Sequence, residues 1–394
     1  MLQKLTDPTR FAVDMFNGEP LRVGLIDADL LDGGTRCPNL ALLKMAGWLT
    51  QRGHAVRLVC DYSELESDLF SKGADDFDAL ICSQVFKFTI RPATLQKLIE
   101  DGKCFYGGTG FFEINAPRLP DEVEHARPLY TLYDEYISKQ PGTESEKAKK
   151  FKAYKQFSIG FTTRGCFRQC PFCVNRTYKR VAEHSPIAEF VDPSRPYIYL
   201  FDDNFMAAPR KLFFSTLEAL NATGKRFQFR QGLDIRLMTD EKAKGLAESR
   251  YYGDYIFAFD HVDAPTVKAT LRGLETWRRH CNKSTKIYVL VAFDGVDEND
   301  VASMFWRIRE CMRFNCLPYI MRFEKYKTSR WQKLYTAVTR WCNQPALFKK
   351  KSFREFCAMP ANKTLRIHEE FAAEFPAIDA EYYDMKLEHF TQHA

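Results

Sequence analysis

The sequence predicts an α/β protein with two successive series of parallel strands followed by a helical segment. Short apolar runs end in polar or charged clusters, as buried parallel strands do at their carboxyl ends. Amphipathic helical patterns separate these runs at a spacing typical of strand–helix–strand units. The first series covers residues 1–125 and the second covers 157–324, with a linker expected over 126–156 and a helical C-terminal extension over 325–394.

The composition is that of an ordinary globular protein. The chain has 394 residues, of which 45% are hydrophobic and 27% are charged, and this length allows two or three domains with their own cores. No run approaches the roughly 20 apolar residues needed to cross a bilayer. The first twenty residues contain acids and a proline where a signal peptide needs an unbroken apolar run. We therefore expect a cytoplasmic protein without a membrane partner.

The first series predicts a doubly wound, Rossmann-like domain. Residues 40–53 between the first two strands have helical periodicity and end on a glycine, which is a helix stop signal. Residues 138–155 are rich in charged and small side chains, and this composition predicts a linker that does not pack. The expected strands lie within 21–30, 54–61, 77–86 and 103–111.

The second series predicts a (βα)6 partial TIM barrel. Six short apolar runs alternate with helical patterns, and each run ends in a polar cluster. In a parallel barrel these polar ends gather at one mouth. The expected strands lie within 158–166, 197–204, 227–234, 255–263, 287–295 and 318–324.

Three of the twelve cysteines form a cluster in the sequence. Most of the others stand alone in apolar runs, as small buried hydrophobic residues do, and disulfides are not expected in a reducing compartment. Cys166, Cys170 and Cys173 instead share a loop with Gly165 and Pro171, so their thiolates can converge on one metal centre. A cubane iron–sulfur cluster takes four ligands, and three cysteines leave one iron open.

Zinc is the alternative occupant of this loop. A structural zinc ion normally has four protein ligands, and the nearest candidates for a fourth ligand are His184 and Cys281. Neither lies at a usual zinc spacing. This alternative would make the chain a zinc-stabilised nucleic-acid-binding protein without catalysis.

The C-x3-C-x2-C pattern, with Phe172 directly before the last cysteine, resembles the motif of the radical S-adenosylmethionine (SAM) superfamily. The resemblance covers about 157–324, and the motif follows the first expected barrel strand, as in that family. It implies an enzyme with a [4Fe–4S] cluster on Cys166, Cys170 and Cys173, and SAM chelating the open iron. In the family, an electron from the cluster breaks the S–C5′ bond, giving methionine and a 5′-deoxyadenosyl radical that abstracts hydrogen from the substrate. It also implies a reductant such as flavodoxin or ferredoxin.

The resemblance further implies SAM contacts at the strand ends. Phe172 would lie beside the adenine. Asp202, Asp203 and Asn204 occupy the place of the motif that holds the SAM ammonium, although they depart from the common Gly-Gly-Glu. Carboxylates suit a cation in a partly dry pocket. Asp260 matches an acid that commonly binds the ribose hydroxyls.

Two further groups complete the expected site. The position that flanks adenine is matched by Val289, Val291 and Ala292, although the usual glycine pattern is only partly present. The residues expected at the mouth after the third strand, for SAM or for substrate, are Gln231, Asp234 and Arg236. An aspartate at the carboxyl end of a strand is often a helix N-cap instead, and this alternative stays open for Asp202, Asp203, Asp234 and Asp260.

The N-terminal region resembles the cobalamin-binding-type domain of many radical SAM enzymes. Ser83-Gln84-Val85 and Gly107-Gly108 follow the order of that fold's Ser-x-Leu and Gly-Gly elements, in which small residues let a ligand approach the backbone. The Asp-x-His-x-x-Gly loop is absent, so it supplies no histidine to cobalt. The domain is therefore expected to be a degenerate one, and cobalamin-dependent methyl transfer is the alternative within the class.

Two further comparisons with radical SAM proteins concern the N-terminal cysteines and several short sequence elements. A methylthiotransferase-like enzyme needs an additional cluster, but Cys37, Cys60, Cys82 and Cys104 lack the matching spacing and three of them lie within expected strands. The elements GGTGF…LPDEVEH…PLYTLY and RW-x-N-x-P at 340–345 resemble a group of radical SAM proteins.

Residues 303–354 form a basic stretch. They carry thirteen Lys and Arg against two acids, a net charge of +11, and the tail that follows is acidic. Cations for phosphates and aromatic rings for bases are how single-stranded nucleic acid or a nucleotide is held. The alternative is a helical extension whose aromatic residues pack on the barrel. We therefore expect an unidentified anionic substrate, with a nucleotide or nucleic-acid base among the candidates. The interleaved aromatic residues are Trp306, Tyr319, Tyr326, Trp331, Tyr335 and Trp341.

Overall fold

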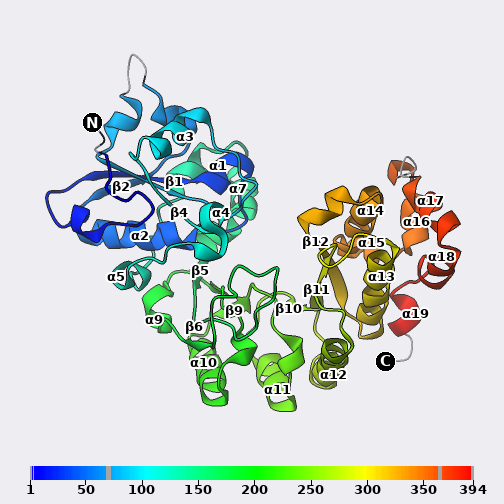
Figure 1. Cartoon of the computed structure of the whole chain (residues 1–394). Helices are drawn as coiled ribbons and strands as arrows, with labels where there is room; N and C mark the ends of the chain where they lie inside the picture. Colours follow the sequence, from blue (N-terminus) through cyan, green and yellow to red (C-terminus); the bar gives the residue numbers. More distant parts are fainter. Residues whose placement is uncertain (1, 3, 68–71, 363–365, 392–394) are drawn as a thin grey trace. The chain divides into compact units, whose positions relative to one another are not determined.

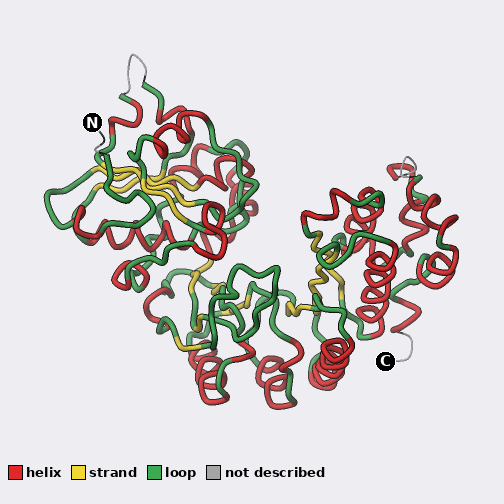
Figure 2. Tube along the Cα trace, viewed as in Figure 1, coloured by secondary structure: helices red, strands yellow, loops and turns green. Residues whose placement is uncertain are grey.

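The computed structural model describes residues 2, 4–67, 72–362 and 366–391. Helices and parallel strands make up the chain (Figures 1 and 2), which confirms the predicted α/β class with parallel sheets. The chain divides into two compact units. We call them the N-terminal unit (residues 1–162, 168–179 and 184–199) and the C-terminal unit (163–167, 180–183 and 200–394).

The N-terminal unit is built on a four-stranded parallel sheet with the order β2-β1-β3-β4. Its strands are β1 (Arg22–Asp27), β2 (Ala55–Leu58), β3 (Ala79–Ser83) and β4 (Phe105–Gly107). The chain runs from β1 to β2 in one direction and from β3 to β4 in the other, so right-handed crossovers place the connecting helices on opposite faces. Figure 1 shows α2 (Leu40–Gln51) and α3 (Ala93–Glu100) on these two faces. β1 is buried along Val23–Asp27, as expected for a central parallel strand.

Short helices complete the N-terminal unit. They are α1 (Ala28–Gly33), α4 (Thr109–Phe112), α5 (Asp121–Glu124), α6 (Asp134–Lys139), α7 (Glu144–Lys150), α8 (Lys152–Gln156) and α9 (Ile187–Phe190). The 3-10 helices are η1 (Val13–Phe16), η2 (Tyr62–Leu65), η3 (Gly73–Asp76) and η4 (Glu113–Asn115). The unit also contains β5 (Phe157–Gly160), which neighbours β8 (Tyr197–Leu200) in a sheet.

Residues 126–156 differ from the linker that their composition predicts. They form α6, α7 and α8, and Tyr133, Tyr136, Phe151 and Tyr154 are buried in the main core of the N-terminal unit. The charged residues that suggested a linker occupy the exposed face of α7. The aromatic residues between them bury enough apolar surface to fix the segment.

The C-terminal unit contains a parallel sheet with the order β10-β11-β12. Isolated parallel bridges, Phe227 with Tyr251 and Leu233 with Phe257, extend it toward β9. Each of the six segments expected to form barrel strands contains a strand, but most of these strands end before the polar cluster. The strands of this unit are β6 (Thr163–Arg164), β7 (Ala182–Glu183), β9 (Arg226–Phe229), β10 (Tyr255–Ala258), β11 (Thr285–Val291) and β12 (Leu317–Arg322).

A helix follows β8 and each strand from β9 onward. Those between the strands are α10 (Arg210–Ala222), α11 (Asp240–Glu248), α12 (Ala264–His280) and α13 (Glu298–Arg313). The segment after β12 contains α14 (Gln332–Cys342), α15 (Pro345–Phe348), α16 (Phe353–Cys357), α17 (Ile367–Glu374), α18 (Pro376–Tyr382) and α19 (Glu388–Thr391). The 3-10 helices are η5 (Phe205–Ala207), η6 (Ile235–Leu237), η7 (Glu324–Thr328) and η8 (Pro360–Asn362). Within the described residues, no helix is both long and apolar enough to span a bilayer.

Candidate active site

The cysteine loop begins where β6 ends. Thr163 and Arg164 of β6 pair antiparallel with Glu183 and Ala182 of β7, so residues 165–181 leave and return to this short ladder. Gly165 has φ of 101°, a conformation that favours glycine, and the chain turns there into Cys166. Cys166 belongs to the C-terminal unit, whereas Cys170 and Cys173 belong to the N-terminal unit, where the backbone N–H of Cys173 donates to the carbonyl of Cys170 at 2.9 Å.

The burial of the twelve cysteines separates this loop from the rest. All twelve are free thiols, and eight of them are buried. Burial raises the pKa of Cys60 to about 11 and that of Cys357 to about 12, and it raises the pKa values of Cys82 and Cys342 well above the ordinary range. Such groups stay protonated and are poor metal ligands. The half-exposed thiols are Cys37, Cys166, Cys170 and Cys173.

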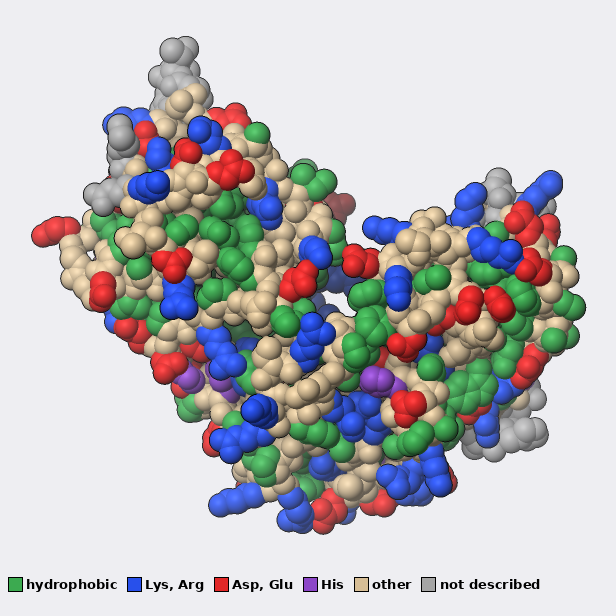
Figure 3. All heavy atoms as spheres, viewed as in Figure 1, with side chains coloured by type: hydrophobic (Ala, Val, Ile, Leu, Met, Phe, Trp, Pro, Cys, Tyr) green, Lys and Arg blue, Asp and Glu red, His purple; other side chains and the backbone are tan. Residues whose placement is uncertain are grey.

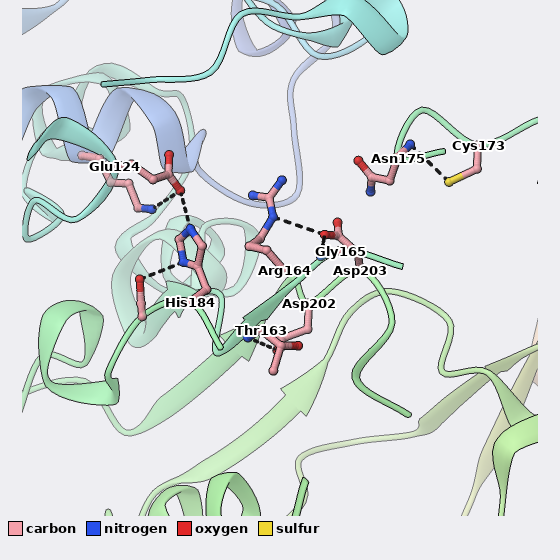
Figure 4. Close-up of polar contacts among 11 residues, drawn as sticks. Glu124, Thr163, Arg164, Gly165, Cys173, Asn175, His184, Asp202 and Asp203 are labelled. Atoms are coloured by element: carbon pink, nitrogen blue, oxygen red, sulfur yellow. Dashed lines mark hydrogen bonds and ion pairs between the residues drawn. The ribbon is translucent and has the colours of Figure 1, made fainter. Parts of the chain in front are cut away.

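Two aspartates that follow β8 hold the start of the cysteine loop (Figure 4). Asp202 Oδ1 accepts hydrogen bonds from Thr163 N at 2.7 Å and from Thr163 Oγ1 at 2.8 Å. Asp203 Oδ2 accepts from Gly165 N at 2.6 Å and from Arg164 Nε at 3.2 Å. The two carboxylates are buried, and charge-assisted hydrogen bonds are stronger than neutral ones in such surroundings. These contacts fix the backbone that leads into Cys166.

Hydrogen bonds also reach two of the cysteine sulfurs. Asn204 Nδ2 donates to Cys166 Sγ at 3.2 Å. The backbone N–H of Asn175 donates to Cys173 Sγ at 3.4 Å (Figure 4). Asn204 is 5% exposed, and its Oδ1 has no hydrogen-bond partner among the described residues. A buried acceptor left in this way marks a place where another group is expected.

A small cavity lies beside Asp260, just after β10. Its volume is about 200 Å³, and its lining includes Asp260, Leu290, Phe293 and Arg307. Burial raises the pKa of Asp260 to about 6, while the hydrogen bond from Leu290 N at 3.0 Å and the nearby Arg307 and Arg236 lower it. Asp234 acts in the opposite direction. Asp260 is therefore a carboxylate at a cavity wall, held by the strand next to it.

Arg307 and Asp300 support this cavity from α13. Arg307 Nη1 donates to the carbonyls of Leu290 at 2.7 Å and of Phe259 at 3.3 Å. Asp300 Oδ2 accepts from Ala292 N at 2.9 Å and from Tyr335 Oη at 2.6 Å. Ala292 has φ of 60°, which costs a non-glycine residue roughly 1–3 kcal/mol and is held only where neighbours over-determine it. Asp300 supplies that restraint.

Sequence reasoning did not single out Arg307, Asp300 or Tyr335 in this role. A signal existed for Arg307, which lies among the buried residues Met304, Phe305 and Ile308 of α13. A lone arginine on the apolar face of a helix needs buried acceptors. Asp300 gave no comparable signal, because it lies in a run of polar residues at the start of α13.

The residues expected at the mouth are placed differently from one another. Asp234 is buried, caps η6 through the N–H of Arg236 at 3.3 Å, and forms a bidentate ion pair with the guanidinium of that residue. Gln231 is exposed. Asp234 and Arg236 lie within electrostatic range of Asp260, whereas the described contacts do not connect Gln231 with that cavity. Phe172 is half-buried in the N-terminal unit.

One face of β11 lines the cavity. Leu290 lines the cavity, whereas Val289 and Val291 are buried and belong to the other face of the strand, because successive side chains alternate. Val289 and Val291 do not line this cavity. The sequence contains this alternation, but all three residues are apolar, so it does not say which of them line the cavity.

Some cations of the basic stretch form ion pairs within the C-terminal unit. Arg309 pairs with Glu381 at 2.5 Å, Arg354 pairs with Asp379 at 2.8 Å, and Arg330 pairs with Glu374. Figure 3 shows basic and acidic side chains next to one another over the C-terminal helices. Trp331, Tyr335 and Trp341 are buried, so these three rings are not available to stack on bases. The structure therefore favours the packing alternative for them.

The N-terminal sheet presents an apolar platform at its carboxyl edge. Val85, Phe86, Phe88 and Ile90, which follow β3, are 46%, 45%, 78% and 73% exposed within the structure. The rings of Phe86 and Phe88 stack with centroids 5.2 Å apart. The Asp29 carboxylate fixes the loop, accepting from Val85 N at 2.6 Å and from Phe86 N at 3.1 Å. We call these four residues the apolar platform.

The small residues expected at this edge are present as well. Ser83 is buried, and its Oγ accepts from Asn39 Nδ2 at 2.9 Å. Gly108 has φ of 108°, and a Cβ there would lie 2.2 Å from the carbonyl oxygen of Gln84. The close approach of the Gln84 carbonyl therefore requires glycine at position 108. Ligands of open α/β sheets bind at this edge.

The donor set of the cysteine loop has the chemistry of an iron–sulfur site, with two sulfurs that accept hydrogen bonds from N–H groups. Cysteine thiolates are the ligands such clusters take, and N–H donors to the sulfurs are their usual surroundings. Among the described residues, no three His, Cys, Asp or Glu side chains are gathered closely enough to hold a metal ion.

Comparison with known proteins gives distant structural matches. No protein-family model matches the sequence, and neither does any curated protein. The chain is similar to solved structures of the cobalamin-dependent S-adenosylmethionine radical enzyme OxsB. With aqua-cobalamin bound, the match has 13% identity over 77% of this chain and 49% of that chain, with a TM-score of 0.33. With aqua-cobalamin and S-adenosylmethionine bound, it has 12% identity, 94% and 58% coverage, and a TM-score of 0.38. The chain thus spans 49–58% of the matched chains, and at these values neither fold nor activity transfers from OxsB.

Proposed function

We propose that this chain is a radical SAM enzyme that holds a [4Fe–4S] cluster on Cys166, Cys170 and Cys173. The observation that carries the proposal is the C-x3-C-x2-C loop together with its surroundings. Cys166 Sγ accepts a hydrogen bond from Asn204. The buried carboxylates of Asp202 and Asp203 accept hydrogen bonds from Thr163 and Gly165, at the start of the loop. The eight buried cysteines are poor ligands by comparison.

The chain's own residues divide the work as follows. Asp202 and Asp203 hold the loop backbone, so their first role is positioning. Asn204 Oδ1 lacks a partner among the described residues and would accept a hydrogen bond from the SAM ammonium. Asp260, at the cavity after β10, would accept hydrogen bonds from the ribose hydroxyls, and Leu290 would contact the adenine. When bound, the cluster and SAM supply reductive cleavage of SAM and a 5′-deoxyadenosyl radical that abstracts hydrogen from the substrate.

The same proposal includes the arrangement of the strands. β5, β8, β9, β10, β11 and β12 would form a (βα)6 partial barrel whose carboxyl ends carry these residues. The parallel pairing of β10, β11 and β12 and the bridges from β9 support it. An external reductant would deliver the electron.

The test is purification without oxygen, followed by metal analysis and a SAM cleavage assay. We expect a brown protein with broad absorption at about 400 nm, bound iron and sulfide, and 5′-deoxyadenosine and methionine on addition of a strong reductant. A colourless protein containing zinc would establish the zinc alternative and overturn the proposal.

Cobalamin-dependent chemistry is a second candidate, and the apolar platform favours it. Four exposed apolar side chains at the carboxyl edge of an open sheet form a surface for a flat ligand. Gly107, where a Cβ would meet nothing within 4 Å, would let the ligand approach the backbone, and no histidine from the loop after β1 would ligate cobalt.

Titration with hydroxocobalamin, followed by its visible spectrum, tests this second candidate. Saturable binding that is lost in Phe86→Ser/Phe88→Ser would support it. A matched control is Val262→Ser, which removes an exposed apolar side chain of the C-terminal unit. Absence of binding by the unmodified chain would remove cobalamin from the function.

A further inference from the structure

The contact between Asn204 and Cys166 has a consequence for electron transfer. Asn204 Nδ2 lies 3.2 Å from Cys166 Sγ, and the residue is 5% exposed. In this orientation the amide is the donor and the sulfur is the acceptor. A thiolate or a cluster-bound sulfur can only accept, so the contact matches a sulfur that ligates metal.

Hydrogen bonds hold the backbone on both sides of this contact. The preceding residue, Asp203, accepts from Gly165 N at 2.6 Å. The carbonyl of Asn204 accepts from Ala207 N at 3.0 Å, at the start of η5. The backbones that carry the donor and the acceptor are therefore fixed by other contacts.

The Oδ1 of Asn204 has no hydrogen-bond partner among the described residues. A buried amide oxygen without a partner costs roughly 1–3 kcal/mol, which an apolar side chain would avoid. Among the described residues, the Nδ2 of Asn204 donates to Cys166 Sγ, the sulfur of a proposed cluster ligand, whereas its Oδ1 has no partner.

We propose that Asn204 sets the reduction potential of the cluster through this N–H···S hydrogen bond. The inference rests on the proposed function. An N–H donor stabilises negative charge on sulfur, and the reduced cluster carries one more negative charge than the oxidised one. The donor therefore stabilises the reduced form more and raises the potential, which eases reduction. Asn204 is in this sense a positioning and tuning residue, acting through Cys166.

Two substitutions remove the donor without a large change of shape. Asn204→Asp keeps two acceptor oxygens, and Asn204→Leu makes the site apolar. The matched control is Asn362→Leu in the same unit. Asn362 is also buried, its Oδ1 also lacks a partner among the described residues, and its Nδ2 donates to a backbone carbonyl, Phe356 O, at 2.9 Å.

The measurement is an anaerobic redox titration of the cluster, followed by electron paramagnetic resonance. We expect both Asn204 variants to be reduced at a more negative potential than the unmodified chain, and Asn362→Leu to be unchanged. An unchanged potential in both Asn204 variants, with the cluster intact, would overturn the inference and leave the proposed function standing. An unmodified chain without any iron–sulfur signal would instead overturn the proposed function.

A second measurement covers the case in which the variants lose the cluster. The unmodified chain is labelled with ¹⁵N at the side-chain amide of asparagine, and the reduced cluster is probed for a ¹⁵N coupling by pulsed resonance. The donor to Cys173 is the backbone N–H of Asn175, which this label does not mark, whereas the side-chain amide of Asn175 is labelled. The measurement is therefore made on Asn175→Ala as well. A coupling that persists in this variant supports the assignment to Asn204, and the absence of a coupling in the unmodified chain overturns it.

Discussion

The carboxylate of Asp203 accepts a hydrogen bond from the backbone N–H of Gly165 at 2.6 Å. Residues 38 positions apart in the chain are thereby joined at the entry to the cysteine loop. Gly165 stands in a positive-φ conformation, so the carboxylate holds a turn that the loop needs. Asp203, at the end of its strand, thus holds the backbone at the start of the cysteine loop.

Replacing Asp203 should loosen this loop. Asp203→Ala removes the hydrogen bonds from Gly165 and Arg164, and charge-assisted bonds of this kind contribute about 1.5–3 kcal/mol. We expect a lower free energy of unfolding by at least that amount and faster loss of iron to a chelator. Asp240→Ala is the control, because Asp240 is 64% exposed and pairs with Arg279 at the surface, where such pairs contribute little. Equal effects of the two substitutions would contradict the positioning role.

The three loop cysteines should be individually required for iron. Cys166→Ala, Cys170→Ala and Cys173→Ala each remove one proposed ligand, and we expect most of the bound iron and all SAM cleavage to be lost. Iron analysis and detection of 5′-deoxyadenosine measure this. Cys37→Ala is the matched control, since Cys37 is also half-exposed. Full iron content in Cys170→Ala would be incompatible with the ligand set.

Asp260 should make stability fall as the pH rises from about 4 to 6. Burial raises its pKa to about 6 from an ordinary value of 3.8. Between these values the folded state holds the proton that the unfolded state has released, so the stabilising effect of the neutral carboxyl is present below the unfolded pKa and lost as the pH passes the folded one. The shift corresponds to at most about 3 kcal/mol.

Asp260→Asn isolates this group from other buried acids. The asparagine side chain cannot ionise. The melting temperature of the variant should therefore fall less than that of the unmodified chain between roughly pH 4.5 and 7, a range that includes the pKa of Asp260 in the folded state. Paired melts across this range measure the difference. Parallel curves would show that Asp260 has an ordinary pKa.

Trp331 should behave as a core residue. It is 4% exposed and packs edge-on against Phe371, with ring centroids 4.8 Å apart. Trp331→Ala should lower the free energy of unfolding by about 3–5 kcal/mol, measured by denaturant unfolding. Lys349→Ala/Lys350→Ala removes two exposed cations and should leave stability nearly unchanged. Little effect of Trp331→Ala on stability would reopen the possibility that its ring serves a ligand.

The sequence by itself determined the features that depend on local pattern. Alternating apolar runs and helical periods placed β10, β11 and the helices around them, because burial of one face imposes its period on the chain. The spacing of Cys166, Cys170 and Cys173 gave the candidate ligand set, because the three residues lie within one segment of eight residues.

Only the tertiary structure decided what each polar strand end touches. In the sequence, Asp202, Asp203 and Asn204 could be helix caps, ligand contacts or residues that hold a loop. Their hydrogen-bond partners, which distinguish these roles, lie 38 or 39 residues away in the chain. The burial of Trp331 and the pairing of Arg330 with Glu374 likewise depend on how α14 and α17 pack. A side chain's hydrogen bonds and solvation are set by residues remote in sequence, and these in turn decide which acids are carboxylates at a cavity wall and which are anchors.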